Sequence, residues 1–290
     1  MAKVCVSTDS TADVPQNLRE ELGIPFLPLT ILAEGKEYRD GVDITPAEFY
    51  KILERCDQIP ASAQVSVNLY TRLFENTVAA GYTHLIHVSI NSKGSGTYQA
   101  GVMAREMFYE EHPELQGKFD IQIVDSRNYS MAYGLAVVAA ARAAREGKEP
   151  EEIMAILRDN LNHGRAIVVP LTLKFVKKSG RISPAAAFLG DALGLKPLIT
   201  FLDGEAQITA KVRGEGKIIP TMLEEFMRVR KPGTPYAVAS AGDPALREAM
   251  EKACVEACGE KPVASIDLGS VISINTGPSA VGLCFYDATL

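Results

Sequence analysis

The 290-residue sequence has no tryptophan, only four histidines and an odd, sparse set of five cysteines. Few cysteines in a chain of this length argue against a disulfide-stabilised scaffold and fit a reducing compartment. No stretch approaches the roughly eighteen consecutive apolar residues that a membrane-spanning helix requires. The first residues, MAKVCVSTDS, lack the apolar core of a secretion signal. We therefore expect a cytoplasmic protein.

Sequence signatures of catalysis and nucleotide binding are also missing. The chain contains no GxxxxGK[ST] loop, no GxGxxG after a strand with an acidic residue downstream, and no GxSxG turn. We therefore expect no ATP site, no cofactor and no enzymatic activity in the chain alone. A net charge of −6 argues against a nucleic-acid partner, which would favour a basic face.

The composition is that of a globular protein, with 47% apolar and 23% charged residues. Expected strands at 3–7, 84–90 and 119–124 alternate with expected helices in the first half of the chain. The spacing of Asp13, Pro15 and Gln16 predicts a helix capped by Asp13, and Thr45 with Glu48 predicts a capping box for a helix that ends near residue 55. This alternation predicts a mainly parallel sheet with flanking helices.

The second half has a different pattern. Asp203-Gly204 lies between two β-like runs and predicts a hairpin. Expected helices at 218–229 and 244–258 and further strands near 236–240, 263–267 and 282–286 complete an α+β unit. We therefore expect an α/β protein with an N-terminal domain at residues 1–160 and a C-terminal domain at residues 161–290.

The segment at residues 91–97, NSKGSGT, follows an expected strand and opens an expected helix. The first N–H groups of a helix have no partner within the helix and carry the positive end of its dipole, so they stabilise an anion. Gly94 and Gly96 allow close approach of the backbone, and Ser95 adds a hydroxyl. The alternative is an ordinary helix start in which the glycines only serve the turn.

Two further polar groups leave alternatives open. Asp9 and Asp125 follow expected strands and are either helix-capping and loop residues or ligands of a magnesium ion. The basic segment at 177–181 is either the end of a helix or an arginine directed at an anion, an acidic partner or a membrane surface.

Eight segments in order make the chain resemble the DegV family of fatty-acid-binding proteins, which includes the acyl-carrying subunit of bacterial fatty-acid kinase. They are STDSTADVP (7–15), YRDGVDITPAEFY (38–50), PASAQVS (60–66), NSKGSGTYQA (91–100), VDSRNYSMAYG (124–134), KKSGRIS (177–183), LKPLITFLDG (195–204) and NTGPSAVGLCFY (275–286). The resemblance implies a two-domain α/β fold with a lipid tunnel between the domains.

The resemblance also implies site residues. The family's carboxylate-binding positions match Ser62, Ser95 and the backbone of Gly96, and an arginine that contacts the head group matches Arg181. Near the C-terminus, Asn275 stands where the family often has histidine. Asn275 can form hydrogen bonds but carries no positive charge.

The function that we expect is a carrier that binds a long-chain fatty acid, with transient membrane contact, and presents the carboxylate to a separate fatty-acid kinase. The kinase would make an acyl phosphate for phospholipid metabolism. Asn275, together with Ser279 in place of a family glycine, puts this phosphoryl-transfer role in question more than lipid binding. The alternatives are a lipid sensor or storage protein without a kinase partner, and a serine hydrolase that uses Ser95 or Ser62.

Overall fold

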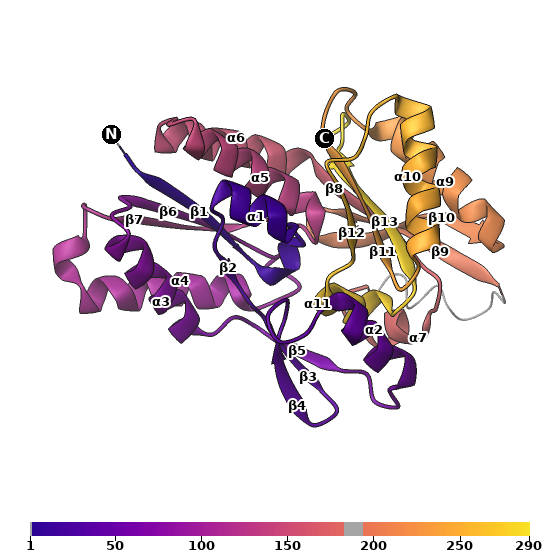
Figure 1. The fold of residues 1–290 in the computed structure, drawn as a ribbon, viewed down its shortest axis with the longest axis horizontal. Coiled ribbons are helices and arrows are strands. Elements are labelled where there is room, and N and C mark those ends of the chain that lie inside the picture. Colours follow the sequence, from indigo (N-terminus) through magenta and orange to yellow (C-terminus); the bar gives the residue numbers. More distant parts are fainter. Residues whose placement is uncertain (1, 183–193) are drawn as a thin grey trace.

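The computed structural model of the protein describes residues 2–182 and 194–290 and has two lobes, each built on its own sheet (Figure 1). Ser183, the last residue of the KKSGRIS segment, lies outside the described residues. The predicted boundary at 160/161 falls in the last turn of α6 (Pro150–His163), shortly before the first strand of the second sheet. The division at this residue stays a prediction.

The first lobe contains a parallel sheet in the order β2-β1-β6-β7. Its strands are β1 (Val4–Asp9), β2 (Phe26–Leu27), β6 (His84–Ser89) and β7 (Asp120–Asp125). Helices α5 (Met131–Arg145) and α6 lie on one side of the sheet, and α3 (Val67–Ala79) and α4 (Thr97–Glu111) on the other (Figure 1). The predicted parallel sheet is confirmed, because alternating strands and helices place successive strands in the same direction.

The second lobe contains a mixed sheet in the order β10-β9-β8-β13-β11-β12. Its strands are β8 (Gly164–Pro170), β9 (Leu195–Leu202), β10 (Glu205–Arg213), β11 (Tyr236–Ala241), β12 (Ala264–Asp267) and β13 (Ala280–Tyr286). The predicted hairpin joins β9 and β10, and both turn residues, Asp203 and Gly204, have positive φ. A turn of this kind matches the twist of the paired strands.

The faces of the second sheet follow the two-residue period of a strand. Ile167 and Val169 pack beneath α9 (Ile218–Val229) and α10 (Pro244–Cys258) on the outer face. Ala166 and Val168 point the other way and join the core cluster that contains α5. Helix α5 therefore packs against the sheets of both lobes, which share one apolar core.

Shorter elements connect the lobes. A small antiparallel sheet, β4-β3-β5, is formed by β3 (Thr30–Ala33), β4 (Lys36–Arg39) and β5 (Ala61–Ala63). The short helices are α1 (Gln16–Leu22), α2 (Pro46–Arg55), α7 (Lys174–Lys178) and α11 (Ser270–Thr276), and the 3₁₀ turns are η1 (Ser10–Ala12), η2 (Pro113–Leu115) and η4 (Glu215–Lys217).

Of the two helix starts predicted at these elements, one is confirmed and one was wrong. Thr45 and Glu48 form the predicted capping box at the start of α2. Asp13 does not cap α1, which begins after Pro15, because the Asp13 carboxylate accepts a hydrogen bond from Ser130 of the chain leading into α5. Residues 61–63 form β5, because β3 supplies an antiparallel partner for them.

Candidate functional site

A cavity of about 340 Å³ lies between the two lobes. Its volume falls within the roughly 300–1,000 Å³ typical of small-molecule sites. The first lobe contributes Ile90 and the loop before α4, and the second lobe contributes the inner face of its sheet and α11. Most lining residues are apolar: Leu29, Ala63, Ile90, Ala166, Ile167, Val168, Ile182, Phe201, Ala239, Leu268, Val271, Ile272 and Cys284. The cavity therefore favours a ligand whose surface is mostly hydrocarbon.

The start of α4 lines this cavity, as the sequence predicts. Gly96 is the residue before the helix, and its N–H makes no hydrogen bond to another described residue. The Ser95 hydroxyl lies 2.9 Å from Thr97 Oγ1 and accepts a hydrogen bond from the Thr97 N–H. An amide without a partner and a hydroxyl beside it can bind the oxygen atoms of an anion.

Both glycines of this loop lie close to other side chains. A Cβ at Gly96 would overlap Gln64 Oε1, and a Cβ at Gly94 would overlap the Tyr129 hydroxyl. The φ of Gly96 is −73°, a value that any residue can adopt. A side chain at position 96 would therefore fit only if the flexible end of Gln64 moved away.

A buried hydrogen-bond network holds the first turn of α4 in place. The Tyr70 hydroxyl donates to the Thr97 carbonyl at 3.2 Å and lies 3.2 Å from His87 Nε2. The other ring nitrogen of His87 lies 2.9 Å from Ser7 Oγ. Burial lowers the pKa of His87 to about 3, so the ring is neutral and serves as a hydrogen-bonding partner rather than a charge. Thr97 Oγ1 also accepts from the Val65 N–H, which links α4 to the segment that carries Ser62.

The other predicted site residues line the same cavity. Ser62 lies on β5, opposite Ile31 of β3. Arg181 lies near the start of α4, and its Nε donates to the Gly94 carbonyl at 3.3 Å. Asn275 lies on α11, where its Oδ1 accepts from Ser179 and its Nδ2 donates to the Val271 carbonyl. Ser62, Ser95, Gly96, Arg181 and Asn275 are thus brought together from distant parts of the sequence.

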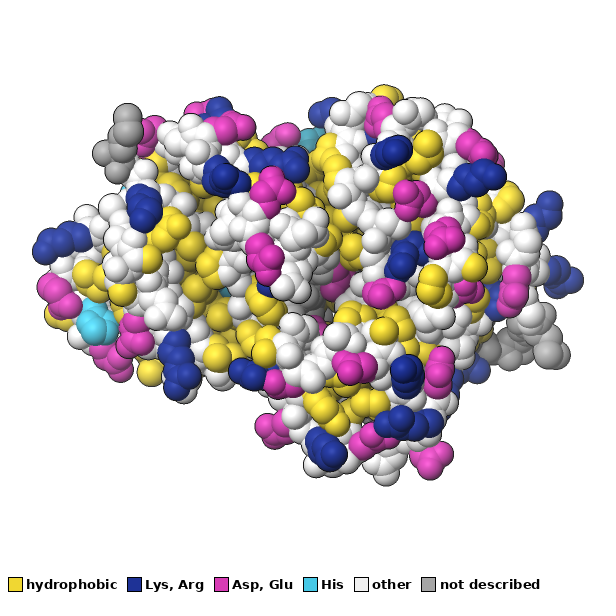
Figure 2. All heavy atoms as spheres, viewed as in Figure 1, with side chains coloured by type: hydrophobic (Ala, Val, Ile, Leu, Met, Phe, Trp, Pro, Cys, Tyr) yellow, Lys and Arg dark blue, Asp and Glu magenta, His cyan; other side chains and the backbone are white. Residues whose placement is uncertain are grey.

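A second recess of about 390 Å³ adjoins the cavity, because Ser62, Arg181 and Asn275 line both. Lys178 lines the recess as well. The polar residues of the cavity are therefore next to a more open surface with two cationic side chains, Lys178 and Arg181. Across the face drawn in Figure 2, by contrast, positive and negative side chains are interspersed.

Four polar residues that line the cavity were not predicted as site residues: Gln64, Tyr129, Ser130 and Thr276. Gln64 lies in the segment that contains Ser62, and Thr276 follows Asn275. Each could have been proposed from its neighbour in sequence. Tyr129 lies before α5, and nothing in its local sequence distinguishes it from an ordinary core tyrosine.

The two aspartates considered for magnesium lie on strands separated by β6 and accept hydrogen bonds from the protein. Asp9 accepts from Thr11, the Ile90 N–H and Tyr133, and Asp125 accepts from Ser92. Within residues 2–182 and 194–290, no group of three or more His, Cys, Asp or Glu is arranged to hold a metal ion.

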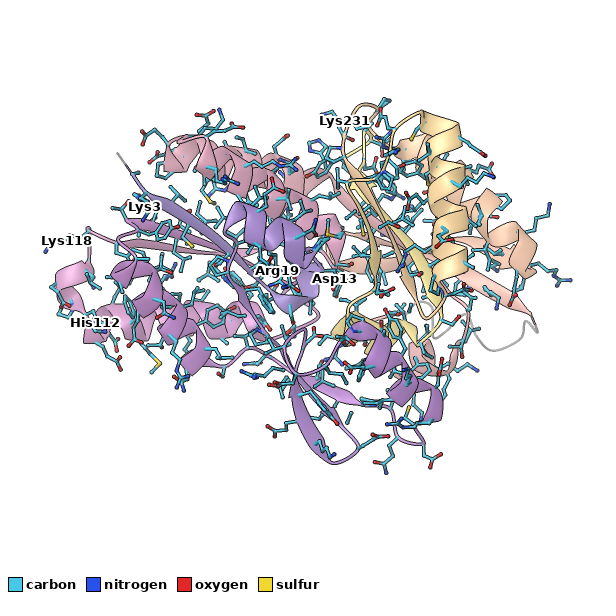
Figure 3. The ribbon with its side chains drawn as sticks, in the orientation of Figure 1. Lys3, Asp13, Arg19, His112, Lys118 and Lys231 are labelled. Atoms are coloured by element: carbon cyan, nitrogen blue, oxygen red, sulfur yellow. The ribbon has the colours of Figure 1, made fainter. Side chains whose placement is uncertain are left out.

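A cluster of buried carboxyl groups lies beside the cavity, at the junction between the lobes. Asp13, which Figure 3 places near the end of α1 that faces the second lobe, accepts from the Ser130 hydroxyl at 2.5 Å. Burial raises the pKa of Asp13 to about 8 and also raises the pKa values of Asp9 and Asp40. Ser130 itself lines the cavity, so this cluster is separated from the cavity by one side chain.

The fold and the site define a class of α/β proteins in which two lobes enclose a mainly apolar cavity with a few converging polar groups. The family model described as "Uncharacterised protein, DegV family" matches residues 3–288. The chain belongs to the DegV family, as its sequence segments predict.

Individual relatives agree with this assignment. A DegV domain-containing protein of Caldanaerobacter subterraneus is 37% identical over 224 residues, covering 77% of this chain and 76% of the relative. The solved structure of a DegV family protein from Thermus thermophilus, described as binding fatty acid, is 30% identical, with a TM-score of 0.85 and coverage of 98% and 99%. A stearic-acid-binding protein from Eubacterium ventriosum is 24% identical and shares the fold, with a TM-score of 0.88 over the whole of both chains.

In the part of the chain that the structure describes, no helix combines the length and the apolar character that crossing a bilayer would demand.

Proposed function

We propose that this protein binds a long-chain fatty acid in the cavity between its lobes. The observation that carries the proposal is one mainly apolar cavity that also contains the unpartnered Gly96 amide and the Ser62 and Ser95 hydroxyls. The fatty-acid binding described for the Thermus thermophilus relative supports it. The fatty acid is thus a ligand that matches both kinds of surface in the cavity.

The hydrocarbon tail supplies most of the affinity. Burial of each methylene contributes about 0.8 kcal/mol, so a sixteen-carbon tail contributes on the order of 11 kcal/mol before the costs of association. The carboxylate loses its hydration and needs hydrogen bonds in return. Ser62, Ser95 and the Gly96 amide supply them, with Arg181 and Asn275 at the edge of the recess. The head group therefore fixes the orientation of the ligand.

We infer further that the chain is a carrier that presents the carboxylate to a separate kinase. The recess supports this proposal, because a partner that reaches Lys178 and Arg181 also reaches the polar end of the cavity. Incubation of the fatty-acid-loaded protein with ATP, with and without a candidate kinase from the same cell, tests it. Acyl phosphate should form only with the kinase, and turnover by the chain alone would contradict the proposal.

A lipid sensor or storage protein is the second candidate function. The Asn275 side chain is already bonded to Ser179 and Val271, and it cannot carry the positive charge that would help a phosphoryl transfer. This candidate predicts bound lipid but no acyl phosphate with any kinase of the cell. A hydrolase based on Ser62 or Ser95 gains no support, since none of the four histidines is among the described residues that line the cavity.

Mass spectrometry of the native protein tests fatty-acid binding directly, and Ser95→Ala tests the head-group site. We expect an added mass equal to a fatty acid, lost on denaturation. A hydrogen bond to a charged group contributes about 1.5–3 kcal/mol, so Ser95→Ala should weaken binding of palmitate roughly tenfold or more. Ser92→Ala is the matched control, because Ser92 donates to Asp125 and does not line the cavity. Equal affinity of the two variants would contradict the assignment of Ser95.

A further inference from the structure

Thr276 is the last residue of α11 and lines the cavity with only 3% of its surface exposed. Its hydroxyl oxygen has no hydrogen-bond partner among the residues that the structure describes. Buried hydroxyls in native proteins nearly always have a partner, so an unpaired one requires an explanation. Of the buried side chains left without a partner in the described parts of the chain, Thr276 is the one that lines this cavity.

The end of α11 holds Thr276 in this position. The Gly277 N–H donates to the Ser273 carbonyl at 2.8 Å, which closes the last turn of the helix. Gly277 has a φ of 92° and packs so closely on Phe175 and Thr172 that a Cβ would lie within 3 Å of each. The threonine side chain itself is stiff about χ1, because it is branched at Cβ. Thr276 therefore remains part of the cavity wall, and no described residue supplies a partner for its hydroxyl.

A fatty acid offers only one group that can be that partner. The tail has no hydrogen-bond acceptor, so a methylene against Thr276 would leave the hydroxyl unpaired and desolvated. The carboxylate accepts several hydrogen bonds at once and binds hydroxyl donors at short distance. The position of Thr276, directly after Asn275 at the cavity wall, agrees with a place at the polar end of the ligand.

We propose that Thr276 Oγ1 donates a hydrogen bond to the carboxylate of the bound fatty acid, an inference that rests on the proposed function. Ser62 and Ser95 belong to the first lobe, whereas Thr276 belongs to the second. The carboxylate is then held from both lobes at once, and it supplies the hydrogen-bond partner that the Thr276 hydroxyl lacks in the structure. Head-group recognition thereby depends on the relative position of the lobes.

Thr276→Val tests this role, because valine keeps the shape of threonine and removes the donor. The delipidated variants are equilibrated with palmitate or with 1-hexadecene, a hydrocarbon of the same length, and the retained ligand is quantified after gel filtration. Thr276→Val should bind palmitate about tenfold more weakly, equivalent to about 1.4 kcal/mol, and should retain hexadecene like the wild type. Thr276→Ser, which keeps the hydroxyl, should restore palmitate binding.

Thr172→Val is the matched control, because Thr172 packs against Gly277 but does not line the cavity. Thermal unfolding verifies that each variant folds, and Thr276→Ala replaces the valine variant if that one does not. Wild-type affinity of Thr276→Val for palmitate would overturn the proposal, as would an equal loss of both ligands, which would indicate a packing role. A wild-type protein that binds no palmitate would overturn the proposed function and this inference together, so the two failures are distinct.

Discussion

Replacement of Asn91 by alanine should destabilise the contact between the two lobes. Asn91 is fully buried at the end of β6, and its Nδ2 donates to the Tyr129 hydroxyl and to the Gly204 carbonyl, both at 2.8 Å. Its Oδ1 accepts from the Lys93 N–H at 3.1 Å. Each neutral hydrogen bond contributes about 1 kcal/mol, so the loss of three lowers the free energy of unfolding by roughly 3 kcal/mol.

Urea denaturation followed by circular dichroism measures this change. The control is Lys93→Ala, because Lys93 pairs with Glu205 across the same contact between the lobes but does so at the surface. Exposed ion pairs are screened by solvent, so the control should change stability much less than Asn91→Ala. If Asn91→Ala destabilised the protein no more than Lys93→Ala does, the buried Asn91 amide would not be the group that stabilises the contact between the lobes.

Three other substitutions test separate parts of the structure. Gly96→Ala should leave stability nearly unchanged but weaken palmitate binding several-fold in a titration. The reason is that the new methyl group displaces the flexible end of Gln64 at the cavity wall. Unchanged affinity for palmitate would contradict this prediction. The pKa of Asp13 is raised from 3.8 to about 8, so the folded state binds more protons than the unfolded state between these values, and stability falls as pH rises from about 4 to 8. Asp13→Asn should reduce that slope in urea denaturation at pH 5 and pH 8, and an unaltered slope would refute the role of Asp13. Arg165→Met should cost about 3–5 kcal/mol in the same assay by leaving the buried Asp287 without its cation, and a cost below about 1 kcal/mol would show that the pair contributes little.

Features that depend on a few neighbouring residues could be predicted from the sequence. The capping box of Thr45 and Glu48 needs only the residues of one helical turn, and the Asp203-Gly204 turn needs only two residues that tolerate positive φ. The residues assigned to the site by family resemblance also line one cavity, although their contacts with a ligand stay a prediction. Most of the correct sequence predictions therefore depended on local chemistry or on the resemblance to a known family.

Features that depend on distant partners could not be predicted. Asp13 has the spacing of a helix cap, but Ser130, more than a hundred residues away, binds its carboxylate instead. Strand β5 has only three residues and forms because β3 lies alongside it. The unpaired hydroxyl of Thr276 depends on how α11 ends against Phe175 and Thr172, and the NTGPS sequence alone does not show this.

The shared core around α5 has a consequence for experiments on isolated lobes. Helix α5 contacts β1 of the first lobe and β8 and β13 of the second, and it is buried on nearly all sides. A fragment that ends at residue 160 would expose to water the alanine-rich surface that normally lies against β8 and β13. Such surfaces promote self-association, so neither lobe should be expected to express as an independent, monodisperse protein.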